Sequence, residues 1–320
     1  MAQLMTGQLN ATLGTGITVR TGIPHRSGKL PFHAFQKGYP TMVSAQAFWD
    51  AKKSEFIIPK ATDLSETDFS LDSAGYTGML NFSKKGKQVG IGGVFPWTYS
   101  QYLELASALN PNWYSQPDLC CEKQIAKTQE EVDYRVNATA TLLEGTLRFV
   151  YAWQNEIART ETSQVAANML KPPVPVLQGW SADDYLRSLD MMVAVWERWQ
   201  PWLAAPALIG IGSVCRRDLH HPTDGLFAIL KALEPHLPKG ASLHLFGVKG
   251  TALDHLNALD YIESVDSMAW DLAARIKAHK IRVSNTLKHR SNEMDSWMDK
   301  AHARIDSARG ESRLRSALSY

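Results

Sequence analysis

The sequence of 320 residues is poor in cysteine and has no long apolar run. Its three cysteines, Cys120, Cys121 and Cys215, make no disulfide framework and no CxxC pair, which favours a reducing environment. No stretch approaches the roughly 20 apolar residues that cross a bilayer. The N-terminus has neither the basic nor the apolar segment of an export signal. We therefore expect a cytoplasmic protein that does not bind membranes.

Several motifs of common enzyme classes are also missing. There is no H-E-x-x-H, no cysteine–histidine cluster with zinc spacing, no G-x-S-x-G elbow and no Walker loop. The side chains of adjacent His220 and His221 diverge, and vicinal Cys120 and Cys121 cannot easily chelate one ion. The GIGG at 90–93 is too short to hold a pyrophosphate. We expect no metal and no cofactor.

The composition is that of a globular protein, with 44% hydrophobic and 21% charged residues. The net charge of +2 is unevenly distributed. Residues 275–320 hold 11 Lys and Arg against 5 Asp and Glu, whereas the rest of the chain holds 23 against 27. This basic end suits contact with a polyanion, and a solvated helical tail would show the same bias.

Short apolar segments alternate with amphipathic ones along most of the chain. The apolar segments are FIIP, FSLDSAGY, VGIGGVF, WYSQPDLCC, VPVLQGW, ALIGIGSVC, SLHLFGV and IESVDSMAW. Alternating strands and helices predict parallel strands with right-handed crossovers. About eight such units predict an α/β fold of the (β/α)₈, TIM-like barrel type, with an open doubly wound sheet as the alternative. Residues 1–40 are expected to be irregular, with at most one short strand.

Five segments carry helix signals. Residues 100–110 have apolar side chains at i, i+3, i+4 and i+7, and the segment from Ser181 opens with a Ser181–Asp184 capping box. Two further segments begin at Thr223 and Thr251, which are good N-cap residues. Residues 122–156 predict one or two long helices, with Gly145 as the candidate break.

Residues that are unusual at the end of an apolar segment follow several predicted strands, where a barrel places its catalytic groups. They are Asp72, Asp118, Gln178, Gly212, Ser213 and Asp266. Carboxylates without a metal motif suit attack on the anomeric carbon of a sugar. A carboxylate also accepts from the N–H groups of guanine, and an amide donates to its O6. An enzyme that did both would exchange a base on a nucleic acid.

These stretches resemble the tRNA-guanine transglycosylase superfamily, and within it the deazapurine-DNA branch. The DpdA-like enzymes of that branch insert 7-deazaguanines into DNA in phages and bacteria. LDSAGY is similar to the family's Asp-Ser-Gly-Gly-Tyr motif, with Ala74 in place of one of its two glycines. QPDLCCE, PVLQGW, GIGSV and HLFGV with VDSMAWDLAAR are similar to its other motifs, in the family's order, between residues 72 and 275.

The resemblance implies a role for each candidate residue. Asp266 would be the nucleophile, and Asp72 the acid that handles the protons of the base. Gln178 would donate to O6, and Tyr76 would cover the base. The base-binding residues that it implies are Ser73, Tyr76, Asp118, Cys120, Gln178, Gly179, Gly212 and Ser213.

The C-terminal region departs from the tRNA enzymes, which carry a C-x-C-x-x-C…H zinc site after the nucleophile strand. This chain has no cysteine after Cys215, so we expect no zinc subdomain. The predicted division is a barrel at 1–275 and a basic helical extension at 276–320. The expected nucleic-acid contacts are Arg216, Arg217, Arg275, Lys277, Lys280, Arg282, Lys288 and Arg290.

The predicted function is replacement of guanine in DNA by a free 7-deazaguanine such as preQ0 or preQ1, through a covalent intermediate on Asp266. The expected partners are DNA and the free base, with tRNA less favoured. The protein would be a monomer or homodimer, in the host cytoplasm if a phage encodes it. The alternatives are the same reaction on tRNA, a non-catalytic nucleic-acid-binding subunit, and an unrelated barrel hydrolase that acts on sugars.

Overall fold

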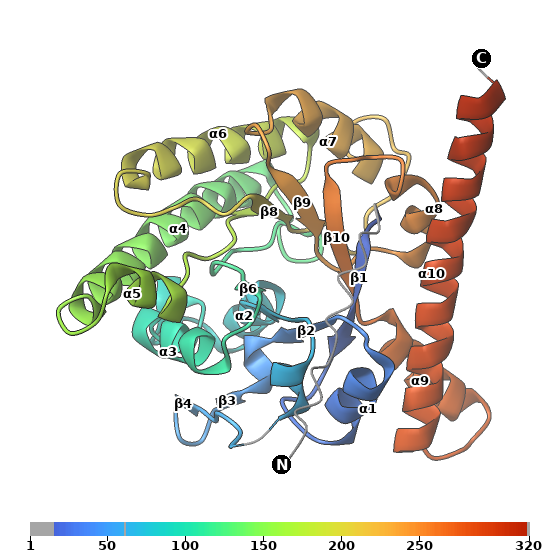
Figure 1. The fold of residues 1–320 in the computed structure, drawn as a ribbon, viewed down its shortest axis with the longest axis horizontal. Helices are drawn as coiled ribbons and strands as arrows, with labels where there is room; N and C mark the ends of the chain where they lie inside the picture. The colour runs from blue at the N-terminus through green and yellow to red at the C-terminus, as the bar shows by residue number, and fades with distance from the viewer. Residues whose placement is uncertain (1–15, 61, 319–320) are drawn as a thin grey trace, which may run out of the picture.

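The computed structural model describes residues 16–60 and 62–318. Its centre is a curled sheet of eight parallel strands with helices around it (Figure 1). Neighbouring strands follow the chain order, and the last strand pairs with the first. The strands are β1 (Thr18–Ile23), β2 (Thr41–Ser44), β5 (Phe69–Asp72), β6 (Trp113–Tyr114), β7 (Val176–Leu177), β8 (Leu208–Ile211), β9 (Ser242–Leu245) and β10 (Ile262–Ser267).

Short contacts join the two ends of this sheet, β6 and β7. Ser115 and Val174 form a parallel bridge. The N–H of Val174 donates to the carbonyl of Tyr114 at 2.8 Å, and the N–H of Gln116 donates to the carbonyl of Val174 at 2.9 Å. The curled parallel sheet thus fits the TIM-like architecture that the sequence predicts, and not the open doubly wound alternative.

Helices cover the outside of the sheet. They are α1 (Lys29–Lys37), α2 (Gly75–Lys85), α3 (Tyr99–Leu109), α4 (Gln129–Ile157), α5 (Ser163–Met169), α6 (Ala182–Trp199), α7 (Leu226–Leu233), α8 (Leu253–Leu256), α9 (Ala269–Lys280) and α10 (Leu287–Leu318). The predicted helix at 100–110 is confirmed as α3. The capping box is confirmed in α6, where Ser181 and Asp184 satisfy each other's backbone N–H groups. Within the described ranges, no helix is both long and apolar enough to span a bilayer.

Of the one or two helices predicted over 122–156, the structure has one, α4, which continues through Gly145. A side-chain carbon at Gly145 would lie 2.6 Å from the hydroxyl of Tyr99, so the glycine serves close packing. Two other helix predictions were wrong. Helix α7 starts after Gly225 and not at Thr223, since carbonyls of the preceding loop accept from its first N–H groups. The segment from Thr251 forms only a 3₁₀ turn and the single turn of α8.

Strand β1 lies within residues 1–40, where at most one short strand was expected, whereas β2 follows them in a segment for which no strand was predicted. Strand β1 carries a charged residue, Arg20, which is only 5% exposed and pairs with Asp68 at 2.7 Å. The FIIP segment instead lies at a small antiparallel pair, β3 (Trp49–Asp50) with β4 (Glu55–Phe56). VGIGGVF forms a 3₁₀ turn at Ile91–Gly93. Residues 1–15 of the predicted irregular segment lie outside the described residues.

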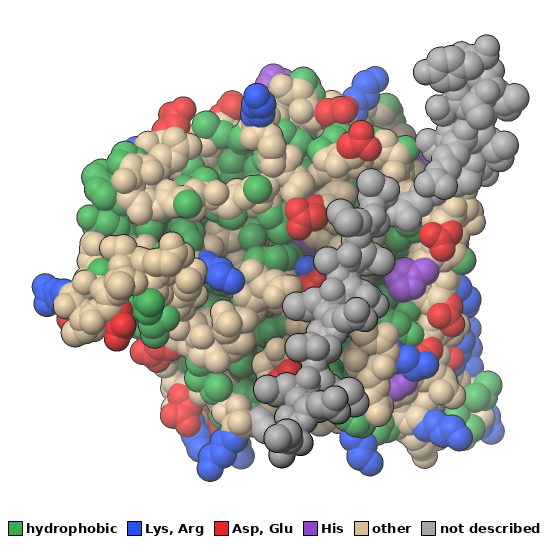
Figure 2. All heavy atoms as spheres, viewed as in Figure 1, with side chains coloured by type: hydrophobic (Ala, Val, Ile, Leu, Met, Phe, Trp, Pro, Cys, Tyr) green, Lys and Arg blue, Asp and Glu red, His purple; other side chains and the backbone are tan. Residues whose placement is uncertain are grey.

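The C-terminal helices pack onto the barrel. The predicted boundary at residue 275 falls inside α9, and the division into barrel and extension stays a prediction. Helix α10 contributes Met294, Met298, Ala301 and Ile305 to the same apolar core as the strands. Lys and Arg side chains lie along the right and lower-right edge of Figure 2, over α9 and α10, together with acidic ones. The four apolar side chains of α10 pack it against the barrel.

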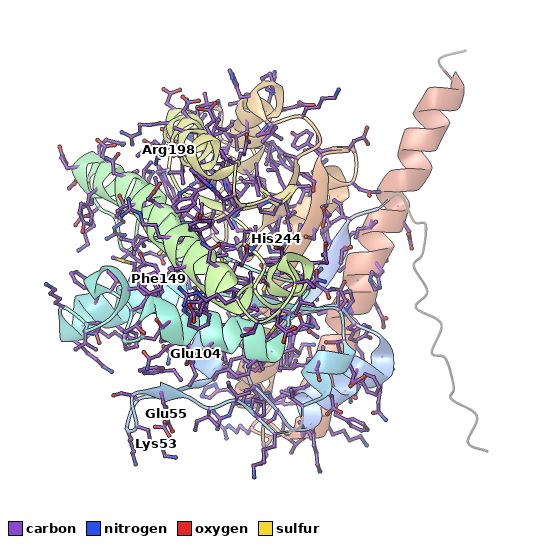
Figure 3. The ribbon with its side chains drawn as sticks, turned by 60° about the vertical axis from the view of Figure 1, so that its left-hand side comes forward. Lys53, Glu55, Glu104, Phe149, Arg198 and His244 are labelled. Atoms are coloured by element: carbon purple, nitrogen blue, oxygen red, sulfur yellow. The ribbon has the colours of Figure 1, made fainter. Side chains whose placement is uncertain are left out.

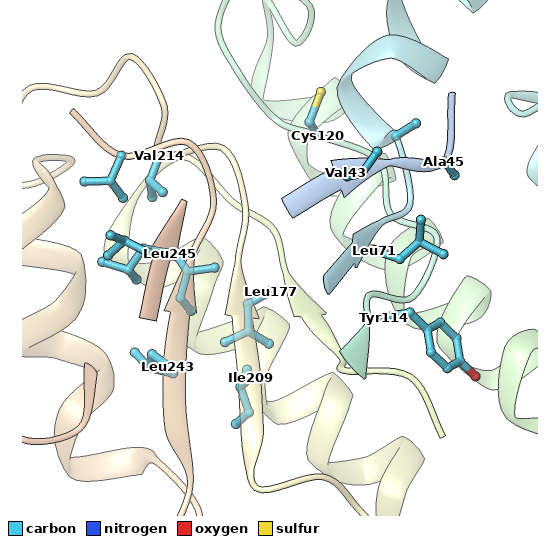
Figure 4. Packing of buried hydrophobic residues seen from close by; sticks show 14 of the residues in the cluster. Val43, Ala45, Leu71, Tyr114, Cys120, Leu177, Ile209, Val214, Leu243 and Leu245 are labelled. Atoms are coloured by element: carbon cyan, nitrogen blue, oxygen red, sulfur yellow. The ribbon is translucent and has the colours of Figure 1, made fainter. Parts of the chain in front are cut away.

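Strand alternation separates an apolar layer from a polar interior. Side chains such as Leu71, Leu177, Ile209 and Leu243 are buried between the strands and the helices (Figure 4). Burial of each such side chain contributes about 1.5–3 kcal/mol. Residues of the other parity face into the ring. His244, for example, lies among the strands in the middle of the molecule (Figure 3).

Candidate active site

The site lies at the carboxyl ends of the barrel strands. Asp72 is the last residue of β5, and Asp266 is the penultimate residue of β10. Asp118 follows β6, and its carboxylate contacts Gln178, which follows β7. The charges of Asp118 and Asp266 both raise the pKa of Asp72. The structure thus brings the three acids and the amide to one mouth, because parallel strands end on the same side.

Asp118 is buried and accepts two hydrogen bonds. The hydroxyl of Ser73 donates to Oδ1 at 2.8 Å, and the amide of Gln178 donates to Oδ2 at 2.5 Å. Burial raises the pKa of Asp118 to about 6, although these two bonds oppose the shift. The carboxylate is therefore held in one orientation and retains lone pairs for a ligand.

The orientation of the Gln178 amide follows from a chain of donors. The N–H of Cys121 donates to the hydroxyl of Ser213 at 2.6 Å, so the proton of that hydroxyl goes to Gln178 Oε1, also at 2.6 Å. The NH₂ group of Gln178 must then face Asp118. Gly212 permits this arrangement, since a side-chain carbon there would lie 2.1 Å from Gln178 Nε2.

Asp72 is an unusual carboxyl group. Burial raises its pKa to about 7, and the charges of Asp118 and Asp266 act in the same direction. The N–H of Ala74 donates to Asp72 Oδ2 at 3.1 Å and partly opposes the shift. Near neutral pH this group is divided between its acid and base forms, as a proton-transfer group requires.

Ala74 has a left-handed backbone, with φ 70° and ψ 30°. A residue with a side chain is strained in that region by about 1–2 kcal/mol, which exceeds the extra conformational entropy that glycine loses on folding. We expect Ala74→Gly to raise the free energy of unfolding by about 0.5–1 kcal/mol, measured by denaturant titration. Ala106→Gly, in the right-handed turns of α3, is the matched control and should lower it. Destabilisation by Ala74→Gly would contradict the strain argument.

Asp266 is placed for contact with a ligand. Its side chain is 13% exposed. The N–H of Gly247 donates to Oδ1 at 2.8 Å, and His244 Nε2 lies 3.4 Å from the same oxygen. No described residue donates a hydrogen bond to Oδ2. One oxygen is therefore held by the protein while the other is available.

Arg217, expected to contact nucleic acid, is instead part of the framework of the site. It is 2% exposed, and its guanidinium donates to the backbone carbonyls of Gly179, Ser213 and Asp224. It also lies over the ring of Trp180, 4.0 Å from the ring centre. A phosphate cannot reach a buried group satisfied in this way, so Arg217 holds the loops after β7 and β8 together.

The remaining base-site candidates differ in exposure. Cys120 is buried, burial raises the pKa of its thiol, and its carbonyl accepts from Arg135 at 2.8 Å. Tyr76 is half-buried, with the exposed guanidinium of Arg216 5.7 Å from its ring centre. Tyr76 and Arg216 thus lie together at the rim of the site.

The expected nucleic-acid contacts on α9, on α10 and on the segment that joins them fall into two groups. Arg275 and Arg290 pair with Asp271, and Lys277 pairs with Glu293. The other three, Lys280, Arg282 and Lys288, are exposed and make no ion pair with any described residue. The second group is therefore the better placed to meet phosphates.

Two titratable residues of the site were missed. Glu122 has a buried oxygen without a hydrogen-bond partner in the described part of the chain, and burial raises its pKa. His244 lies beside Asp266. The sequence offered a signal for each of them. Glu122 is an acid directly after the two cysteines of QPDLCCE, and His244 is a histidine within the apolar segment SLHLFGV. Among residues 16–60 and 62–318, no group of three His, Cys, Asp or Glu side chains could hold a metal ion.

The curled parallel sheet carries three acids and an amide at its mouth. Together with the family match below, this arrangement indicates a transglycosylase-like enzyme. The chain belongs to the DpdA family: the family model described as DeoxyPurine in DNA protein A matches residues 57–308. This membership points to deazapurine-related modification, with DNA as the substrate. None of the curated proteins matches the chain.

Proposed function

We propose that the protein replaces guanine in DNA with a free 7-deazaguanine through a covalent intermediate on Asp266. The observation that carries the proposal is the fixed polarity of the Asp118–Gln178 pair beside Asp266. Asp118 would accept from N1–H and N2–H of guanine, and the second amide hydrogen of Gln178 would donate to O6. Adenine presents the opposite donors and acceptors at these positions, so the pair selects guanine-like bases.

The proposed reaction is a double displacement. The guanine is first flipped out of the stack, at a cost of a few kcal/mol. Asp266 attacks C1′, the C1′–N9 bond breaks, and Asp72 donates a proton to the departing guanine. A 7-deazaguanine then enters the same pocket and loses its N9 proton to Asp72. Its nitrogen attacks C1′ and releases Asp266, so the configuration at C1′ is retained overall.

Nucleoside analysis tests the proposal. The protein is incubated with duplex DNA and, separately, tRNA, each with a panel of free 7-deazaguanines. The expected result is a 7-deazaguanine nucleoside in the DNA and an equal amount of released guanine. Incorporation into tRNA alone would favour the tRNA reaction, and a lack of incorporation into either would overturn the proposal.

The raised pKa of Asp72 also predicts a pH-dependent stability. Its pKa is about 7 in the folded protein against an ordinary value of 3.8, so between these values the folded state binds a proton that the unfolded state does not. Stability is therefore lost as pH rises towards 7. We expect Asp72→Asn to melt at a higher temperature than the parent at pH 8, with a difference that shrinks as pH falls towards 4.

Asp260→Asn, at an exposed acid before β10, is the matched control for Asp72→Asn and should show no such trend. If the difference in melting temperature between Asp72→Asn and the parent is the same at every pH in this range, the pKa of Asp72 is not raised in the folded protein. The same Asp72→Asn protein should be slow in base exchange, because it retains the shape of the site without the proton-transfer group.

A further inference from the structure

His244 is a buried imidazole for which the proposed reaction has no role so far. It has no exposed surface and packs edge-on against the rings of Trp113 and Phe246, whose centres are 4.8 and 4.6 Å from its own. Its Nδ1 lies 2.8 Å from the hydroxyl of Ser264. Its Nε2 has no hydrogen-bond partner among the described residues and lies 3.4 Å from Asp266 Oδ1.

The charge state and the tautomer of His244 follow from these neighbours. Burial lowers its pKa, and the charge of Arg20 adds to that effect while Asp266 opposes it. The ring is therefore neutral near pH 7 and carries one proton. A carboxylate can only accept, so that proton must be on Nε2, facing Asp266. Nδ1 then accepts from the hydroxyl of Ser264.

We propose that His244 is the positioning residue for Asp266 in the exchange reaction, an inference that rests on the proposed function. Its Nε2–H and the N–H of Gly247 both point to Oδ1, so the carboxylate is turned with Oδ2 towards the sugar. The 3.4 Å contact shortens to a hydrogen bond when the substrate closes the site, as catalytic contacts often do. Oδ2 is the oxygen that forms the bond to C1′.

The neutrality of His244 matters for this role. A protonated imidazole would stabilise the negative charge of Asp266 strongly and weaken it as a nucleophile. A neutral N–H orients the carboxylate while leaving its charge largely in place. Arg20 pairs with Asp68 at 2.7 Å, and its charge helps to keep the imidazole neutral. The chain Ser264–His244–Asp266 thus has a fixed direction of donation.

The test compares two replacements of His244 in the full-length protein. His244→Phe keeps a flat ring but removes the N–H, whereas His244→Gln retains an amide N–H at a similar reach. We measure the rate of covalent adduct formation at saturating DNA, the KM for DNA, and the binding of a free 7-deazaguanine by calorimetry. We expect His244→Phe to slow adduct formation by about 10- to 100-fold with base affinity unchanged, and His244→Gln to recover most of the rate.

A packing role would give a different result. If His244→Phe and His244→Gln lose rate and base affinity to the same extent, or if His244→Phe keeps the parental rate, the positioning role is overturned. Should His244→Phe fail to fold, Ser264→Ala decides. That protein must form the adduct several-fold more slowly with unchanged base affinity, and a parental rate would overturn the inference.

The outcome also separates this inference from the proposed function. If the parent protein forms no adduct with any DNA and 7-deazaguanine, the proposed function fails. If the parent forms the adduct and His244→Phe forms it equally fast, only the positioning role fails.

Discussion

Asp266→Asn is expected to bind DNA and a free 7-deazaguanine like the parent protein but to form no covalent adduct on a denaturing gel. The amide has nearly the same shape as the carboxylate, so the N–H of Gly247 can still donate to its oxygen. It lacks the negative charge that attacks C1′. Because no other described residue takes over this step, base exchange should fall by a factor on the order of 10³ or more.

The matched control for Asp266 lies on the same strand. Glu263 faces away from the site, is exposed, and accepts a hydrogen bond from Ser242. Glu263→Gln removes a carboxylate from β10 without touching the mouth and should exchange bases at the parental rate. Exchange of labelled guanine by Asp266→Asn at the rate of Glu263→Gln would exclude a nucleophilic role for Asp266.

Asp118→Asn is expected to cause the second largest loss. The polarity of Gln178 is set by Ser213, so the new amide must turn its oxygen to the NH₂ group of Gln178 and its nitrogen to Ser73, which can accept. The protein should therefore fold. A base would now meet an NH₂ group where it requires an acceptor, and the affinity for a 7-deazaguanine should fall by about 100-fold.

Ligand variation sharpens this test of Asp118. A 7-deazahypoxanthine lacks the exocyclic amine that Asp118 would accept from. The parent should bind it much more weakly than the guanine analogue in calorimetry, whereas Asp118→Asn should discriminate little between the two. If both proteins discriminate equally, Asp118 does not read that amine, and the proposed orientation of the base is wrong.

The structure confirmed those local predictions that depend only on residues close together in the sequence. The capping box of Ser181 and Asp184 requires only one turn of chain, and it is present in α6. The helix at 100–110 follows from apolar spacing and is present as α3. Strand ends with an acid, such as those of Asp72 and Asp266, could be identified because an apolar run stops at a charged residue.

Predictions failed where a distant residue determines the local structure. Strand β1, in a region expected to hold at most one short strand, could not be recognised as part of the barrel, because Arg20 is unusual inside a barrel and only its pairing with Asp68, far along the chain, makes that burial tolerable. The start of α7 could not be predicted because carbonyls of Asp218 and Leu219 satisfy its first N–H groups in place of Thr223. Arg217 was expected at a phosphate, but loop carbonyls surround it.

The sequence by itself determined the α/β class, the order of the strands that bear acids, and the family, because these depend on periodicity and on short motifs. Only the tertiary structure decided which charged groups face the mouth, which form internal ion pairs or hydrogen bonds, and which are protonated. Burial raises the pKa values of Asp72 and Asp118. The charges of Asp118 and Asp266 add to the shift of Asp72, and hydrogen bonds from Ser73 and Gln178 oppose that of Asp118. These neighbours lie at or after the ends of different strands. Such neighbours are defined only once the chain has closed into a ring.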